Sequence, residues 1–175
     1  MRKTILAALL VLAMVIAARP AFAGKVGFVD LSKVLELTKM GQEISRKIAA
    51  RTDELKIKVK KAELKVVTLR DALKRTESAL SDEAKKKKYE ELNNALQEYQ
   101  QIAQQAMMDI EQFKLTLFKE LISKVKVVTS KLAASNGYDL VLLKVEDVMT
   151  EGSVVLYGSS SVDLTDLVIR QMNAQ

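Results

Sequence analysis

The longest uninterrupted segment of the chain reads QEISRKIAARTDELKIKVKKAELKVVTLRDALKRTESAL over residues 42–80 and, after Ser81, DEAKKKKYEELNNALQEYQQIAQQAMMDIEQFKLTLFKELISKVKVVTSKLAASN over residues 82–136. It contains neither glycine nor proline, the residues that most disfavour a helix interior. In both halves apolar residues recur at alternating steps of three and four, the spacing that lays a narrow seam along a coiled-coil helix. The segment therefore predicts two long helices that fold back on one another at Ser81.

The turn between these helices has its own signal. Ser81 suits the N-cap of the second helix, and Asp82 and Glu83 would place negative charge in its first turn, where it complements the helix dipole. At about 1.5 Å per residue, each helix is on the order of 60 Å long. We expect a hairpin arm over residues 39–132 with its tip near 78–84. The predicted seam consists of Ile48, Thr52, Leu55, Val59, Ala62, Val66, Leu69, Leu73, Thr76 and Leu80 in the first helix, and of Tyr89, Leu92, Leu96, Tyr99, Ala103, Ala106, Ile110, Phe113 and Leu117 in the second.

The segments on either side of the arm predict a small body. Residues 25–31, 138–143 and 153–157 are rich in β-forming residues and are expected to be strands, with 145–152 connecting the last two. Asp163 is placed to cap a final helix that turns Leu167, Val168 and Met172 inward. The sequence thus indicates an α+β fold.

A single copy of the body is expected to be only marginally stable because it is small. Its two pieces, 24–38 and 133–175, total 58 residues, which bury a marginal core and leave sheet edges exposed. We therefore expect an obligate oligomer that shares its β-structure between copies. The candidate body residues are Val26, Phe28, Val29, Leu140, Val141, Leu142, Val154 and Leu156.

Residues 1–23 have the features of a secretory signal peptide. Arg2 and Lys3 precede an unbroken apolar run from Ile5 to Ala18, and Ala21-Phe22-Ala23 offers small residues at the positions that a signal peptidase reads. The run is too short for a membrane span. We expect cleavage before Gly24 and a soluble, exported protein; a retained N-terminal anchor is the alternative.

Charge is unevenly distributed along the arm. Loss of the signal would lower the net charge from +6 to +3, yet residues 56–88 carry 12 basic and 5 acidic residues, and residues 89–113 carry no basic one. Because the lysines and arginines gather toward the turn, we expect the tip to contact a client protein or an anionic surface. The candidate contact residues are Arg70, Lys74, Arg75, Lys85, Lys86, Lys87 and Lys88. The alternative is that they form the solvated face of a helix.

The residue inventory argues against catalysis. The chain has no cysteine and no histidine, so the usual zinc and thiol chemistries and the commonest general base are excluded. No GxxxxGK[ST] phosphate loop occurs. We expect a protein that is not an enzyme, without catalytic residues, cofactor or metal.

A family resemblance rests on blocks at the two ends of the predicted mature chain. VGFVDLSKVL at 26–35, the charged hairpin, YDLVL at 138–142, VLY at 155–157 and VDLTDLVI at 162–169 together resemble the Skp (OmpH-like) periplasmic chaperones. The resemblance implies a jellyfish-like homotrimer with a small β-barrel-like body and three coiled-coil hairpin arms around a cavity. It also implies an ATP-independent holdase that binds unfolded outer-membrane β-barrel proteins in the periplasm and prevents their aggregation.

Other interpretations remain open at this point. An envelope coiled-coil spacer, or a structural protein that binds anionic lipid or lipopolysaccharide through its tip, would also use a long charged arm. Nucleic acid is not expected as a partner, because the basic stretch lacks interleaved aromatic residues.

Met107 and Met108 are expected to pack within the helix pair rather than to contact a client. Leu115, Phe118, Leu121, Ile122, Val125 and Val128 are expected to dock the arm on the body.

Overall fold

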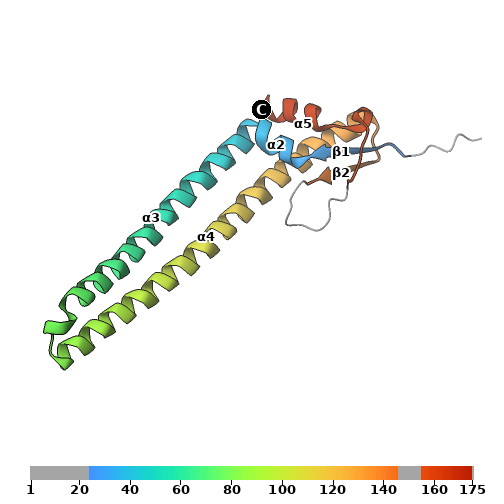
Figure 1. Cartoon of the computed structure of the whole chain (residues 1–175). Helices are drawn as coiled ribbons and strands as arrows, with labels where there is room; N and C mark the ends of the chain where they lie inside the picture. Colours follow the sequence, from blue (N-terminus) through green and yellow to red (C-terminus); the bar gives the residue numbers. More distant parts are fainter. Residues whose placement is uncertain (1–23, 146–154, 175) are drawn as a thin grey trace, which may run out of the picture.

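The computed structural model describes residues 24–145 and 155–174, and shows a long helical hairpin that projects from a small body (Figure 1). In chain order the elements are strand β1 (Val26–Asp30), helices α2 (Leu31–Leu37) and α3 (Lys39–Thr76), the 3-10 turn η1 (Glu77–Ala79), helix α4 (Asp82–Asn136), strand β2 (Leu140–Lys144), the 3-10 turn η2 (Ser160–Val162) and helix α5 (Thr165–Asn173). The predicted signal peptide at 1–23 lies outside the described residues. None of the helices in the described ranges is both long and apolar enough to cross a membrane.

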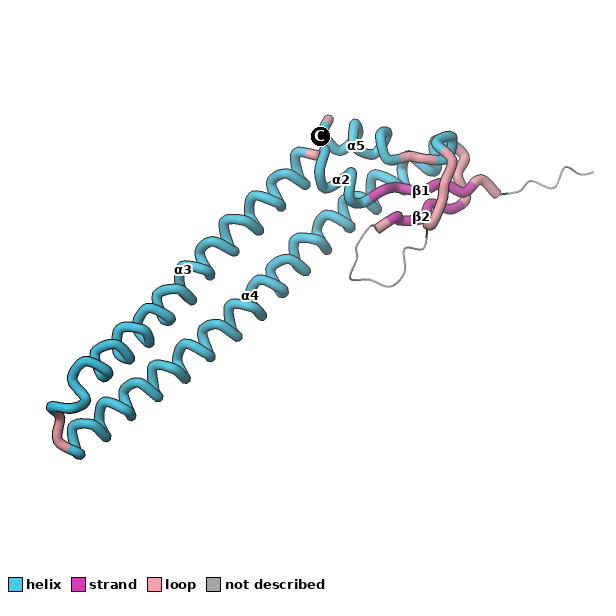
Figure 2. The backbone as a smooth tube through the Cα atoms, viewed as in Figure 1, coloured by secondary structure: helices cyan, strands magenta, loops and turns pink. Residues whose placement is uncertain are grey.

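The hairpin predicted from the heptad pattern is confirmed. Helices α3 and α4 run side by side in opposite directions, with 38 and 55 residues (Figure 2). Seam residues from both helices are buried, among them Leu55, Val66 and Leu73 on α3 and Leu117 on α4. Thr76 and Tyr89 are exposed, so their assignment to the seam was wrong, and Ala95 is a buried contact that the prediction missed. Thr52 is also exposed, but it lines a groove between the two helices.

The turn follows the expected capping chemistry. The Ser81 hydroxyl accepts a hydrogen bond from the backbone N–H of Ala84 at 3.3 Å, and Asp82 and Glu83 form the first turn of α4. Helix α3 ends at Thr76, a few residues before the predicted end, because the chain tightens into η1. A reversal this short keeps the two helix ends close enough to continue the seam.

At the base of the arm, a kink separates α2 from α3. Thr38 is completely buried; its hydroxyl donates to the carbonyl of Val34 at 2.7 Å and accepts from the N–H of Gly41 at 3.0 Å. One side chain thus closes α2 and caps α3. Asp30 caps α2 in the same way through the N–H groups of Ser32 and Lys33.

The body contains a two-stranded sheet in which β1 and β2 are parallel, with Val26 opposite Leu140 and Asp30 opposite Lys144. Both strands were predicted to within two residues. The parallel direction follows because the whole hairpin serves as the crossover connection between them. On the other edge of β1, Phe28 forms a single bridge with Asp163.

The predicted third strand is wrong in its described part. Residues 155–157 are irregular, because Asp163 rather than this stretch takes the second edge of β1. Residues 153–154, including the candidate body residue Val154, and residues 146–152 of the predicted connection lie outside the described ranges.

The core sits where the base of the arm meets the sheet and α5. Leu121, Val125 and Val128 of α4 pack with Val29, Val34, Leu164 and Val168 from the other elements. The expected docking by α4 is therefore confirmed for these three residues and for Phe118, which is half-buried against the same core, whereas Leu115 and Ile122 are exposed. Asp163 accepts a hydrogen bond from the N–H of Thr165, the first residue of α5, at 2.8 Å, but the N-cap position is taken by Leu164, one residue later than predicted. Val168 and Met172 of α5 face inward as predicted, but Leu167 is exposed and Ile169 is buried in its place.

Candidate interaction surfaces

Large apolar side chains are exposed along the arm. Met107 is 72% exposed, Met108 53% and Leu115 55%, so the expectation that the methionines pack within the helix pair was wrong. Met108 and Leu115 each follow a seam residue, Ala106 or Phe113, by two positions. Two residues turn a helix by about 200°, which directs these side chains away from α3.

Helix α4 therefore carries a second apolar line, which we call the outer stripe: Met108, Leu115 and Ile122, at heptad spacing and all exposed. Helix α3 has a counterpart in Ile57 and Leu64, which are exposed and follow the seam residues Leu55 and Ala62 by two positions. Each helix of the arm thus offers apolar side chains to a partner as well as to its neighbour.

In the middle of the arm, the side chains do not fill the space between α3 and α4. A groove of about 380 Å³ opens between the helices where small side chains leave the seam incomplete. Its lining consists of Thr52, Leu55, Lys56, Val59, Ala103, Ala106, Met107 and Ile110. The hydroxyl of Thr52 is satisfied by the carbonyl of Ile48 at 2.8 Å, so the groove presents an almost wholly apolar wall with Met107 at its edge.

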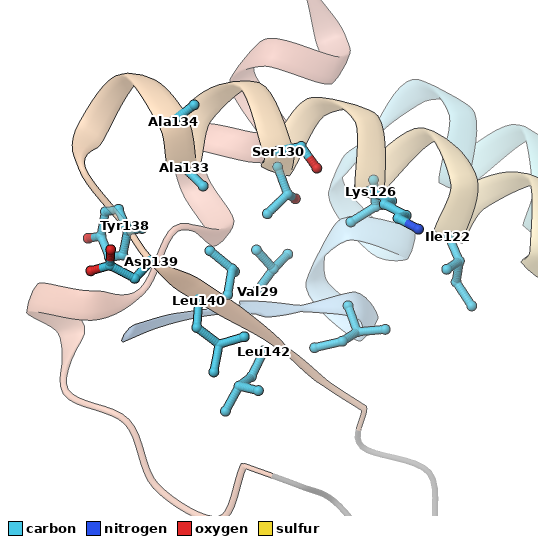
Figure 3. A pocket seen from close by; sticks show the side chains of 14 residues that line it. Val29, Ile122, Lys126, Ser130, Ala133, Ala134, Tyr138, Asp139, Leu140 and Leu142 are labelled. Atoms are coloured by element: carbon cyan, nitrogen blue, oxygen red, sulfur yellow. The ribbon is translucent and has the colours of Figure 1, made fainter. Parts of the chain in front are cut away.

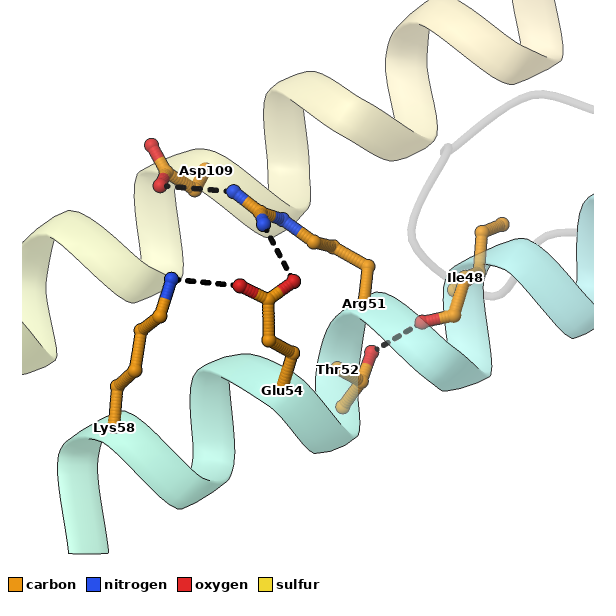
Figure 4. Close-up of polar contacts among 6 residues, drawn as sticks. All are labelled: Ile48, Arg51, Thr52, Glu54, Lys58 and Asp109. Atoms are coloured by element: carbon orange, nitrogen blue, oxygen red, sulfur yellow. Dashed lines mark hydrogen bonds and ion pairs between the residues drawn. The ribbon is translucent and has the colours of Figure 1, made fainter. Parts of the chain in front are cut away.

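One flank of the arm is held by charged pairs across and along the hairpin (Figure 4). Arg51 contacts Asp109 of α4 at 3.6 Å and Glu54 at 2.7 Å, and Lys58 contacts the same Glu54 at 2.7 Å. Hydrogen bonds from Lys58 and then Arg51 hold the pKa of Glu54 below its ordinary value. Closer to the tip, Lys65 of α3 pairs with Glu98 of α4 at 2.6 Å. Part of the uneven charge seen in the sequence therefore forms ion pairs between basic residues of α3 and acidic residues of α4.

The tip is less basic than the sequence suggested. Lys85, Lys87 and Lys88 lie 3.9, 3.5 and 3.0 Å from Asp82, Glu83 and Glu91. From Arg70 to Glu91, seven basic residues stand among six acidic ones. The remaining candidate residues at the tip, Arg70, Lys74, Arg75 and Lys86, are exposed and form no ion pair within residues 24–145 and 155–174. Free cationic groups are thus present, in a setting of nearly balanced charge.

A hydrogen bond ties the start of α4 to η1. The Tyr89 hydroxyl donates to the Glu77 carboxylate at 2.7 Å, and this bond together with the negative charge of Glu77 raises the pKa of Tyr89. The bond therefore stabilises the tip below the ordinary pKa of tyrosine, and its contribution is lost as the pH rises through the raised value.

We predict that Glu77→Gln returns the pKa of Tyr89 to the range of an exposed tyrosine, because the charged acceptor is removed. A pH titration of the tyrosine ring signals by NMR, with Tyr89→Phe to assign the resonance, measures the change. Tyr99, which lies farther along α4, serves as the internal control. An identical Tyr89 titration in both proteins would show that the bond does not form in solution.

A hollow on the body lies between β2 and the end of α4 (Figure 3). This body groove has a volume of about 570 Å³ and is lined by Val29, Ile122, Val125, Lys126, Thr129, Ser130, Ala133, Ala134, Tyr138, Asp139, Leu140, Val141, Leu142 and Leu143. Ile122, the last residue of the outer stripe, is part of this wall, so the apolar surface of α4 continues into the body.

One polar atom in the body groove has no partner. The Thr129 hydroxyl oxygen is buried and makes no hydrogen bond within residues 24–145 and 155–174. By contrast, Thr68 and Thr116 each donate to the carbonyl four residues earlier, at 2.8 and 2.9 Å. A buried hydroxyl without a partner costs free energy, so the groove favours an occupant that supplies a polar group.

The candidate body residues fall into two groups. Phe28 and Val29 are buried within the chain, and Val141 and Leu142 are half-buried. Val26, Leu140 and Leu156 are exposed, which leaves them available for contacts with another molecule. The described residues contain no group of three or more acidic side chains close enough to hold a metal ion.

Comparison with known proteins finds a matching family and matching solved structures. The family described as "Outer membrane protein (OmpH-like)" matches residues 25–172. Among solved structures, a protein of Caulobacter crescentus CB15, assigned as an OmpH-like outer membrane chaperone, superposes with a TM-score of 0.72. It is 12% identical in sequence, and the superposition covers 89% of this chain and 87% of that one. None of the curated proteins matches the chain.

Proposed function

The chain belongs to the OmpH-like family, and on this premise we propose that it is an ATP-independent holdase, which binds unfolded outer-membrane β-barrel proteins and prevents their aggregation before membrane insertion. Membership of this family supports a chaperone role. The observation that carries the finer proposal is the row of exposed apolar side chains on the arm, in particular Met107, Met108 and Leu115.

The physical requirements of a holdase agree with this surface. An unfolded chain is held best by many weak contacts that adapt to different sequences, since a few strong ones would prevent release. Methionine side chains are flexible and polarisable, which suits such contacts. The shallow groove in the middle of the arm adds apolar area without enclosing a client, so release needs no nucleotide.

The proposal includes the oligomer and its location. Residues 24–38 and 133–175 would form the body of a homotrimer with a β-barrel-like core, and the arms of residues 39–132 would surround a cavity. Export by the signal at 1–23 would place the protein in the periplasm, where unfolded outer-membrane proteins pass. The large apolar groove on the body and the exposed Val26 and Leu140 of the sheet support an oligomer, because a second copy would cover them.

The proposal is tested with the purified mature chain, residues 24–175. Light scattering should give the mass of a trimer, and a urea-denatured outer-membrane barrel diluted into a stoichiometric amount of the protein should stay soluble without ATP. The barrel alone, and the barrel with an equal mass of an unrelated soluble protein, are the controls. Aggregation at the rate of the controls would contradict the holdase proposal, whatever the oligomeric state.

The second candidate function is a structural or spacer role through contact of the tip with anionic lipid or lipopolysaccharide. The four cationic side chains at the tip that form no ion pair in the described residues favour it. Flotation with anionic and neutral vesicles measures this directly. Binding to anionic vesicles without any protection of a client would favour the structural role.

We predict that replacing Lys85, Lys86, Lys87 and Lys88 by Gln slows client association and weakens its salt dependence, while most of the affinity remains. The lysines contribute long-range attraction, but three of them are already paired with acids. Stopped-flow association at several salt concentrations measures the effect.

A control with the same loss of charge separates the tip from the shaft of the arm. Replacing Lys56, Lys58, Lys60 and Lys61 by Gln removes four positive charges well away from the turn. If both variants slow association equally, overall charge rather than the tip sets the rate, and the tip has no special role.

A further inference from the structure

The two most exposed large apolar residues among the described ones, Leu156 and Tyr157, are neighbours on the body, 93% and 88% exposed. The backbone on both sides of them is anchored. Val155 is buried, and Gly158 lies so close to the ring of Phe28 that an added Cβ would be 2.3 Å from its Cε1. The segment is therefore held against the sheet while these two side chains project into solvent, an arrangement that typically marks an interaction site.

The same body offers a matching hollow. The body groove between β2 and α4 is mainly apolar and contains the exposed Leu140. It also includes the buried hydroxyl of Thr129, which has no hydrogen-bond partner among the described residues. Its volume of about 570 Å³ lies in the range of pockets that hold drug-sized molecules, so it has room for two side chains. Neither Leu156 nor Tyr157 lines the groove of its own chain.

We propose that Leu156 and Tyr157 of one copy pack into the body groove of the next copy. Leu156 would cover the apolar wall at Leu140. The Tyr157 hydroxyl would form a hydrogen bond with the Thr129 hydroxyl, which would then have a partner. Tyrosine fits this position because a buried tyrosine combines apolar area with a polar group that needs a partner.

This contact limits the symmetry of the assembly. The projecting pair and the groove are different surfaces, so the contact either repeats head-to-tail around a closed ring, as in a trimer, or occurs twice across a two-fold axis. The inference rests on the proposed function only in taking the protein to be an oligomer. It adds which residues of one copy complete the body of another.

The chain has no cysteine, so engineered cysteines test the contact directly. A Tyr157→Cys chain and a Leu140→Cys chain that carries a size tag are unfolded, mixed, refolded and treated with a short bis-maleimide linker. We expect a covalent dimer that contains both chains. The pair Tyr157→Cys with Gln104→Cys, which is exposed on the arm, should stay unlinked. No linked dimer from the first pair would overturn the proposal.

The double variant Leu140→Cys/Tyr157→Cys distinguishes contact between copies from contact within one chain. Linked dimers and larger species are expected; a product linked only within its own chain would overturn the proposal. A second measurement does not depend on linking. Leu156→Asp/Tyr157→Asp should weaken association at least tenfold by analytical ultracentrifugation, whereas Leu64→Asp on the arm should not.

An unchanged mass of the Leu156→Asp/Tyr157→Asp protein would likewise overturn this interface, even where the wild-type chain protects clients. Conversely, a wild-type protein that links as expected but fails to keep a client soluble would contradict the holdase proposal alone. The two failures are therefore distinguishable.

Discussion

Gly41→Ala is expected to cost about 3 kcal/mol of stability or more, the upper range for a forced steric insertion. An added Cβ would lie 2.0 Å from the carbonyl oxygen of Leu35 and 2.6 Å from its Cα. These are backbone atoms of α2, so no side-chain rotation relieves the clash. The kink at Thr38 would have to open, which would separate the buried Val34 of α2 from Ile44 of α3. Urea unfolding followed by circular dichroism, at one fixed protein concentration, measures the loss.

Gly137→Ala is the matched control, because Gly137 requires its lack of a side chain for a different reason. It ends α4 with φ of 67°, and an added Cβ would meet nothing within 4 Å. Its cost is the left-handed backbone conformation alone, about 1–2 kcal/mol. If Gly41→Ala were as stable as wild type, or lost less than Gly137→Ala, α2 and α3 would not approach each other as described.

The parts of the fold that the sequence predicted correctly are those specified by local patterns. The heptad spacing and the Ser81 cap determine the hairpin, and the β-forming runs around Phe28 and Val141 determine two strands. Helix α2 was missed because its seven residues are too few for a periodic pattern. The strand predicted at 153–157 was wrong in its described part because β-propensity does not say which segment takes the edge of β1.

The candidate surfaces also divide into those that a local sequence pattern specifies and those that depend on the tertiary fold. The exposure of Met108 could have been recognised from the register, since the second position after the seam residue Ala106 turns away from the partner helix, whereas Met107, one position after it, lies beside the groove between the helices. The pairing of tip lysines was also visible, because Asp82, Glu83 and Glu91 lie three or four residues from them. The body groove was not predictable locally. It exists because β2 and the end of α4 are brought together by the tertiary fold.

Replacing Met107, Met108 and Leu115 together by Gln is expected to weaken client binding roughly tenfold to a hundredfold. Full burial of an apolar side chain of this size contributes about 1.5–3 kcal/mol, and adaptable contacts bury only part of each one. A loss of about 1.4 kcal/mol corresponds to each factor of ten. Gln is a good helix former, and all three side chains are exposed, so the hairpin itself should keep its stability. Fluorescence titration of a labelled, unfolded outer-membrane barrel gives the affinity.

The neighbouring glutamines make the test specific for apolar contact. Gln101→Ala/Gln104→Ala/Gln105→Ala alters three exposed residues just tipward of the methionines without removing apolar area, and should leave client affinity within about twofold of wild type. Both variants should retain the wild-type mass, because neither touches the body groove. Equal affinity of the Met107, Met108 and Leu115 variant and the wild type would locate client binding elsewhere. If both variants lost affinity alike, the surface would act through its polar groups or its shape, and the apolar mechanism would be wrong.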